Sequence, residues 1–201
     1  MTLRIERFSG KGLEKYVDEL ARLRIEVFRE FPYLYDGSLE YEQKYVRTYM
    51  GVSDSVIVIA FDSDRVIGAS TGLPLEAETD EVRKPFLDHS YVPGKIFYFG
   101  ESVLEKAYRG KGLGVRFFEE REAHVRGLGR FEWTCFCAVQ RPEDHPRRPE
   151  NYLPLDAFWN KRGYFKHPEL NTTLSWREIG EQSESPKPMT FWLKRLSGER
   201  A

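Results

Sequence analysis

Cysteine is scarce in this chain: its 201 residues include two, Cys135 and Cys137. On a strand, side chains two positions apart point to the same face, at a separation that disfavours a disulfide bond. No further cysteine is present to build a disulfide framework or a zinc site. We therefore expect a reduced protein that holds no metal, with both cysteines packed inside a strand.

An excess of one charge and long apolar runs are missing as well. The 31 basic side chains nearly balance the 32 acidic ones, so no overall field attracts nucleic acid or a membrane. No apolar run approaches the length of a membrane-spanning helix, and residues 1–8 lack the positive and apolar regions of a signal peptide. These absences predict a cytoplasmic protein whose partners include neither nucleic acid nor a membrane.

The chain does have enough apolar material for one sizeable core. Hydrophobic residues make up 40% of it and aromatic residues 14%. A chain of this length and composition normally folds as one domain. We expect a single domain over residues 1–201, and the oligomeric state stays open, with a homodimer among the alternatives.

The most informative segment is residues 108–114, YRGKGLG, where glycine recurs at every second position. An apolar, β-rich run (96–104) precedes it and a helical pattern (115–128) follows it. Glycine permits positive φ angles and close approach, so that successive backbone N–H groups can point at one anion. The start of the helix adds unpaired N–H groups and the positive end of its dipole. The segment predicts a phosphate site formed by Arg109, Gly110, Lys111, Gly112, Leu113 and Gly114.

The spacing of this segment narrows the choice of phosphate ligand. A Walker loop needs a Ser or Thr after Lys111, and a dinucleotide fingerprint needs a third glycine that is absent. The pattern Arg/Gln-x-x-Gly-x-Gly/Ala is present as Arg109, Gly112 and Gly114, and it resembles motif A of the GNAT N-acetyltransferase superfamily. The resemblance implies that the amides of the turn hold the pyrophosphate of acetyl-coenzyme A. The alternative is a basic turn that needs glycine only for its geometry.

The order of the expected elements is similar to that family over essentially the whole chain. The resemblance implies an α/β (α+β) fold, with a mixed, mostly antiparallel sheet of six to seven strands flanked by helices. The acidic stretch 76–81 is expected to be a solvated face. Periodicity predicts strands at 2–8, 55–61, 66–75, 95–104, 132–139, 172–178 and 189–196, and helices at 13–31, 38–49, 80–87, 115–128 and 155–162.

A second local match lies at residues 158–164, FWNKRGY, which is similar to the family segment Phe-Tyr-Glu-Lys-x-Gly-Phe. It implies a helix beside the thiol of the coenzyme. Many family members have a tyrosine in place of Trp159, and its hydroxyl reprotonates the departing thiolate. An indole N–H is no useful acid at neutral pH. Two interpretations of Trp159 therefore stay open. It only packs, in the core or against the pantetheine arm, or another group supplies the proton to the thiolate.

The chemistry that the resemblance implies is direct attack of an amine on a thioester. The pantetheine arm would lie as a pseudo-strand against the backbone of Val103 and Leu104. Glu101 is the first candidate for the base that removes the proton of the amine, with Tyr98 and Ser102 as polar neighbours. A salt-bridged or solvated strand residue is an equally open interpretation of Glu101.

Two loops are candidates for binding the acceptor. In the link 31–37, the aromatic faces of Phe31 and Tyr33 suit a cationic amine. In the proline-rich loop 140–150, His145 is an alternative base, although a lone loop histidine is more often only a polar surface residue. The same loop has three arginines that can clamp an acceptor carboxylate: Arg141, Arg147 and Arg148.

Two classes of function follow from these residues. The first is an acetyl-coenzyme A dependent N-acetyltransferase whose acceptor is a small amine or an amino-acid-like or peptide molecule. The second is a catalytically silent coenzyme A binder, a sensor or regulatory module on the same fold, which the missing tyrosine favours. A thiol acyl carrier at Cys135 or Cys137 is a weaker alternative. Nucleic-acid binding through Arg109 and Lys111 is weak too, because no basic stripe with aromatic residues surrounds them.

Overall fold

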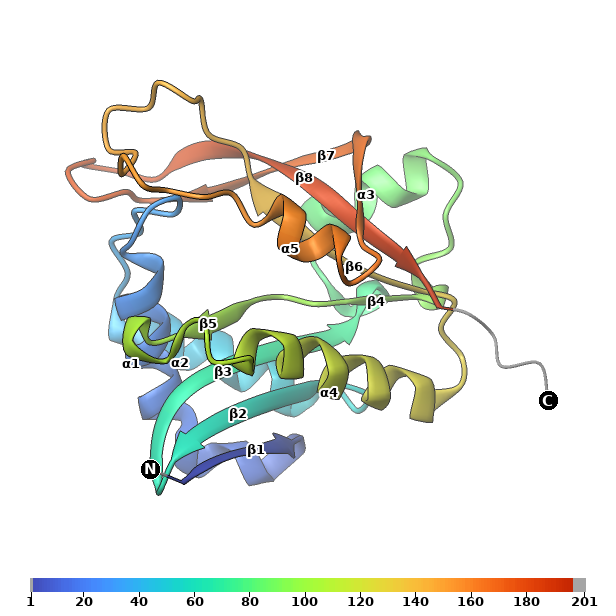
Figure 1. Cartoon of the computed structure of the whole chain (residues 1–201). Coiled ribbons are helices and arrows are strands. Elements are labelled where there is room, and N and C mark those ends of the chain that lie inside the picture. Colours follow the sequence, from blue (N-terminus) through green and yellow to red (C-terminus); the bar gives the residue numbers. More distant parts are fainter. Residues whose placement is uncertain (1, 197–201) are drawn as a thin grey trace.

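The computed structural model describes residues 2–196. Over that range eight strands form one sheet in the order β1-β2-β3-β4-β6-β8-β7, and β5 pairs with β3 beyond the end of β4 (Figure 1). Every pair is antiparallel except β4 with β6. The strands are β1 (Leu3–Phe8), β2 (Val56–Asp62), β3 (Arg65–Pro74), β4 (Ile96–Tyr98), β5 (Ser102–Leu104), β6 (Trp133–Val139), β7 (Phe165–Trp176) and β8 (Ser185–Arg195).

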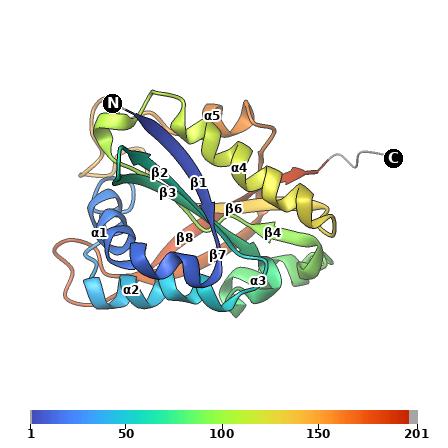
Figure 2. The same cartoon turned by 90° about the horizontal axis from the view of Figure 1, so that it is seen from below.

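Helices cover both faces of this sheet. Figure 2 shows α4 and α5 on one face and α1, α2 and α3 on the other. The mixed, mostly antiparallel sheet flanked by helices confirms the expected fold class. In the described range, no helix is both long and apolar enough to cross a bilayer. The helices are α1 (Val17–Phe28), α2 (Leu39–Thr48), α3 (Asp80–Asp88), α4 (Leu113–Leu128) and α5 (Asp156–Asn160).

Successive side chains of β2 point to opposite faces of the sheet and belong to two different parts of the core. Val56, Val58 and Ala60 pack against α4, whereas Ile57 and Ile59 pack against α1 and α2. Successive side chains of a strand point to opposite faces, so a strand that is apolar throughout is buried on both. All five side chains are at most 1% exposed. The central strands therefore pack against a layer of helices on each face of the sheet.

Local sequence signals place most elements within a few residues. Ser38 caps α2 by accepting the N–H of Tyr41 at 3.3 Å, as expected. The helix expected over 13–31 begins as a 3-10 turn, becomes α1 at Val17 and ends at Phe28. It stops before the expected end because a residue that precedes proline, here Phe31, is disfavoured in the helical conformation.

Strand β7 is longer than expected, starting at Phe165 rather than near residue 172. Its first half contains Pro168 and polar side chains, which hide the strand pattern. Proline is tolerated there because β7 is the last strand of the sheet, and its register against β8 shifts between His167 and Asn171.

The expectation of one strand over 95–104 is wrong, and this break positions the site. The segment splits into β4 and β5 around Gly100, which makes the sheet eight-stranded rather than six- or seven-stranded. A Cβ atom at Gly100 would overlap the Tyr49 hydroxyl and the Thr71 Oγ1 atom. The break therefore depends on a close approach that only glycine allows.

Candidate functional site

Strands β5 and β6 move apart just after β4 ends, leaving an opening called here the strand gap, between residues 100–104 and 136–139. The N–H of Phe99 donates to the carbonyl of Cys135 at 2.7 Å, and the following residues turn toward β3. In Figure 1, β5 and β6 diverge from this point. Among residues 2–196, β5 pairs with β3 alone, so its other edge faces the strand gap.

The register of β5 decides which backbone groups face the strand gap. The N–H of Thr71 donates to Glu101 and that of Glu105 donates to Ile67, both at 3.0 Å. Antiparallel pairs alternate, so Val103 also directs its N–H and C=O toward β3. The expectation that Val103 pairs with a ligand is therefore wrong. Ser102 and Leu104 present their backbone groups to the strand gap instead.

The opposite edge of the strand gap follows from the same alternation. The N–H of Gln140 donates to the carbonyl of Pro188 at 2.9 Å, which fixes the phase of β6 against β8. Cys137 and Val139 therefore direct their backbone groups away from β8 and into the strand gap. An extended ligand between β5 and β6 would meet donors and acceptors on both sides.

The glycine turn lies at one end of the strand gap. Gly110 and Gly112 have φ angles of 78° and 82°, a conformation that glycine adopts without strain. Gly112 is the residue before the first turn of α4. In the described chain, the N–H groups of Gly110, Lys111 and Gly112 have no protein acceptor. Together with the unpaired N–H groups at the start of α4, they form what is called here the cradle, a set of free donors that could hold an anion such as a pyrophosphate.

The basic side chains of the turn do not point into this cradle. Arg109 forms an ion pair with Glu30 at 2.6 Å and donates from Nε to the carbonyl of Leu104 at 3.0 Å. Lys111 lies over the Tyr108 ring at 5.0 Å, and Leu113 is 4% exposed in the core. Arg109 thus joins the glycine turn to the segment that follows α1 and to β5, and the backbone of the turn is left as the part that can meet an anion.

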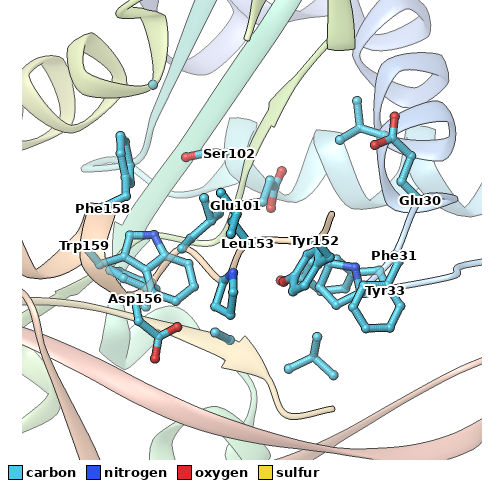
Figure 3. Close-up of a pocket in the computed structure, with 18 of the residues that line it drawn as sticks. Glu30, Phe31, Tyr33, Glu101, Ser102, Tyr152, Leu153, Asp156, Phe158 and Trp159 are labelled. Atoms are coloured by element: carbon cyan, nitrogen blue, oxygen red, sulfur yellow. The ribbon is translucent and has the colours of Figure 1, made fainter. Parts of the chain in front are cut away.

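The turn and the strand gap open onto one pocket of about 1390 Å³. Figure 3 shows Phe158 and Trp159 along one side and Phe31, Tyr33 and Tyr152 along the other, with Glu101 and Ser102 between them. Expected site residues that line it are Phe31, Tyr33, Glu101, Leu104, Arg109, Gly110, Gly112, Gly114, Arg141, Arg147, Arg148 and Trp159.

Trp159 packs in the core and also forms part of the pocket wall. Its ring packs edge-on against Phe136 and Trp192, with centroids 5.0 and 4.9 Å apart, and it also lines the pocket. Phe158 approaches the turn, because a Cβ atom on Gly114 would lie 3.4 Å from its ring. Helix α5 therefore forms the wall of the pocket that faces α4.

Glu101 is held by two partners on the opposite face of the sheet. Its carboxylate forms an ion pair with Arg24 of α1 and accepts a hydrogen bond from the Tyr45 hydroxyl of α2 at 2.9 Å. Arg24 also pairs with Glu42. Although burial lowers it, the pKa of Arg24 is raised well above its ordinary value by these carboxylates. Glu101 is thus salt-bridged, and its side chain also lines the pocket.

Sequence reasoning missed Arg24, although the chain carries a signal for it. Arg24 lies four residues after Leu20 and one after Leu23, on the stripe of α1 that faces the core. A charged residue on such a stripe needs a buried partner. Which partner it meets depends on the tertiary structure, because Glu42 and Glu101 come from other elements.

The three loop arginines have different surroundings. Arg141 donates to the carbonyls of Pro32 and Tyr33 at 2.7 and 3.2 Å and pairs with Glu178, so its guanidinium is already bound. Arg147 donates to the Ile179 carbonyl at 2.6 Å. Arg148 lies over the Tyr152 ring at 5.0 Å, with no ion pair among the described residues. The three therefore do not form one clamp. Of the three, Arg148 is the one whose guanidinium has neither a hydrogen bond nor an ion pair among the described residues.

Two other candidates lie away from the pocket surface. His145 is absent from the lining, its Nδ1 accepts the N–H of Arg147 at 3.2 Å, and its ring packs on Phe31. Tyr98 is buried, and its hydroxyl lies 3.1 Å from the Cys137 sulfur atom.

Known structures with this architecture include acetyltransferases of the GNAT family. One from Streptococcus pneumoniae matches with a TM-score of 0.59 at 13% identity, over 97% of this chain and 100% of that one. Arabidopsis thaliana NAA60 in complex with acetyl-CoA matches with 0.63 at 14%, over 98% and 100%. Salmonella typhimurium yncA with its cofactor acetyl-CoA matches with 0.59 at 10%, over 100% and 98%.

No protein-family model and no curated protein sequence matches the chain. The similarity therefore lies in the fold rather than in overall sequence identity. The chain therefore has the fold of these GNAT-family acetyltransferases.

Proposed function

We propose that this protein is an acyltransferase that transfers the acetyl group of acetyl-coenzyme A to a primary amine. The observation that carries the proposal is the continuity of three features in one pocket. The unpaired N–H groups at Gly110 to Gly112 suit the pyrophosphate, and the strand gap suits the amide-bearing pantetheine arm. Glu101 lies at the far end, on the face opposite α4.

The reaction would take place in the strand gap, the opening that connects the two faces of the sheet. The N–H of Ser102 faces the strand gap and would stabilise negative charge on the thioester oxygen. The amine would approach from the side of α1 and α2, where Glu101 and the aromatic side chains of Phe31 and Tyr33 line the pocket. Glu101 would accept the proton of the amine directly or through a water molecule.

The acceptor would be a small amine or an amino-acid-like or peptide molecule. Aromatic faces attract an ammonium group, and the unpaired guanidinium of Arg148 suits a carboxylate on the same molecule. Both groups line the pocket on its acceptor side, defined here by Phe31, Tyr33, Glu101, Arg148 and Tyr152. A simple polyamine would leave Arg148 without a counter-charge.

A coenzyme A sensor without turnover is the second candidate. The observation that favours it is the packing of Trp159 between Phe136 and Trp192, at the position where the resemblance implies a tyrosine acid. A thiol-release assay over a panel of amines, amino acids and peptides separates the two. Tight coenzyme binding with no thiol release across the panel would support the sensor.

The cofactor site is tested by calorimetry on two matched glycine variants. Gly112 and Gly129 cap opposite ends of α4, both have positive φ, and a Cβ atom on either meets nothing within 4 Å. Replacing either by valine imposes a similar backbone strain. We expect Gly112→Val to abolish coenzyme A binding and Gly129→Val to preserve it. Equal affinities in the two variants would contradict the proposed cradle.

A further inference from the structure

A buried arginine lies directly behind the strand gap, on the side of α4. Arg121 is 2% exposed, and its guanidinium lies over the rings of Phe99 and Phe118, at 4.1 and 5.0 Å from their centroids. A buried cation normally pairs with a carboxylate. In the part of the chain that the structure describes, the hydrogen bonds of Arg121 go only to neutral oxygen atoms.

Those oxygen atoms surround the break between β4 and β5. Arg121 donates from Nη1 to the carbonyls of Thr71 and Glu101, at 3.1 and 3.2 Å, and from Nη2 to the Ser102 hydroxyl oxygen at 3.0 Å. Burial lowers the pKa of Arg121 to about 10, a value at which it still carries its charge at neutral pH. Its charge is therefore directed through Ser102 toward the pocket.

The hydrogen bond from Arg121 makes the Ser102 oxygen atom an acceptor, which leaves the hydroxyl hydrogen to be donated elsewhere. A hydroxyl has one hydrogen to donate, and this oxygen atom already accepts from a guanidinium. No acceptor among residues 2–196 takes the hydroxyl hydrogen. Ser102 is exposed and lines the pocket, so the hydrogen is available to a ligand there.

Ser102 and Glu101 lie on opposite faces of the sheet. The Ser102 side chain contacts α4 through Arg121, whereas the Glu101 side chain contacts α1 and α2 through Arg24 and Tyr45. Figure 3 shows the two side chains diverging from adjacent positions. An amine that arrives beside Glu101 would therefore leave the sulfur atom of the thioester on the side of Ser102.

We propose that Ser102 is a catalytic residue that donates its hydroxyl hydrogen bond to the departing thiolate, and that Arg121 is the positioning residue that polarises it. The proposal rests on the acetyltransferase function above. The amine nitrogen forms the new C–N bond, and the C–S bond breaks with its electron pair going to sulfur. The nitrogen loses one proton and the sulfur gains one, which yields amide and thiol. The Arg121–Ser102 pair thus stabilises negative charge on the departing sulfur atom, in a site where Trp159 offers no useful acid.

The test is the pKa of the coenzyme A thiol when bound to the protein. It is measured from the ultraviolet absorbance of the thiolate over a pH titration, with protein alone subtracted. In the unsubstituted protein we expect this pKa to lie below that of free coenzyme A. Ser102→Ala should raise it by about one to two units, the effect of removing one hydrogen bond to a charged atom.

Two further variants separate this role from packing. Ser102→Thr keeps the hydroxyl and should restore both the lowered thiol pKa and turnover. Arg121→Gln should raise the thiol pKa as Ser102→Ala does, and Ser102 variants carry the test if Arg121→Gln does not fold. Turnover of Ser102→Ala should fall about 10- to 100-fold, with little change in coenzyme affinity.

Failure of this inference is distinguishable from failure of the proposed function. If the protein binds coenzyme A and acetylates amines, but the bound thiol has the same pKa in the unsubstituted protein and Ser102→Ala, the role of Ser102 is overturned. If coenzyme A does not bind at all, the proposed function itself fails.

Discussion

Arg24 forms an ion pair with Glu101 on the acceptor side of the pocket, and the same guanidinium pairs with Glu42. Both carboxylates are buried, yet of the two only Glu101 lines the pocket in the described chain. Arg24 therefore holds the carboxylate of Glu101 where an amine would arrive, whereas the carboxylate of Glu42 only supports Arg24.

Replacing Glu101 by glutamine should lower kcat far more than it weakens coenzyme binding. A positioned general base contributes about 10²–10⁴-fold, and the loss should be greatest below the pKa of the amine, where a proton must be removed. Glu42→Gln is the matched control, because it breaks the other ion pair to Arg24 without changing the pocket wall. Steady-state kinetics check this, and a Glu101→Gln rate within about threefold of Glu42→Gln would assign the proton to water instead.

In the proposed function, Arg148 binds a carboxylate of the acceptor. Arg148→Ala should raise the KM for the acceptor by about 10- to 100-fold, the range of one charge-assisted hydrogen bond, with the coenzyme KM nearly unchanged. Arg177 is a matched control, because it pairs with Asp36 at 2.9 Å and does not line the pocket. Kinetics in which Arg148→Ala and Arg177→Ala behave alike would remove Arg148 from acceptor binding.

The sequence could predict the parts of the site that are set locally. The glycine turn needs only its own residues and the helix after it, so the sequence predicts a turn at Gly110 and Gly112 before a helix, which begins at Leu113, two residues before the expected start. The cap at Ser38 is local in the same sense. Such features depend on backbone preferences over a few positions, which a single sequence contains.

The remaining features depend on contacts between distant elements. The strand break at Gly100 depends on Tyr49 and Thr71, which belong to other parts of the chain. The partners of Arg24 and Arg121 likewise come from elements far away in sequence. Both arginines lie on the apolar stripes of their helices, so their burial could be suspected from periodicity but their function could not.

The buried thiols give a prediction about reactivity. Cys137 lines the pocket, but burial raises the pKa of its thiol to about 12, and burial raises that of Cys135 well above its ordinary value. At pH 8 a thiol of pKa 12 is ionised to a fraction of about 10⁻⁴. Iodoacetamide should therefore leave the folded protein unlabelled and label both cysteines in urea. Cys137→Ser should retain turnover, whereas its loss would revive the acyl-carrier alternative.

Residues 76–81 were expected to form a solvated face, but the Glu78 side chain is partly buried. It is half-buried at the end of the turn that follows β3, and burial raises the pKa of its carboxyl from 4.5 to about 7. Below pH 4.5 the group is protonated in both the folded and the unfolded chain and has no effect on stability. Between pH 4.5 and 7 the unfolded chain releases this proton first, so the free energy of unfolding falls as the pH rises.

Replacing Glu78 by glutamine should remove this loss of stability. We expect Glu78→Gln to match the unsubstituted protein at pH 4 and to exceed its free energy of unfolding at pH 8 by up to about 3 kcal/mol, because the neutral amide carries no charge to desolvate. Urea unfolding at a series of pH values measures the difference. Glu119→Gln, a change on an exposed carboxylate of α4, provides the baseline. A difference between Glu78→Gln and the unsubstituted protein that stays constant from pH 4 to pH 8 would show that burial does not perturb this carboxyl.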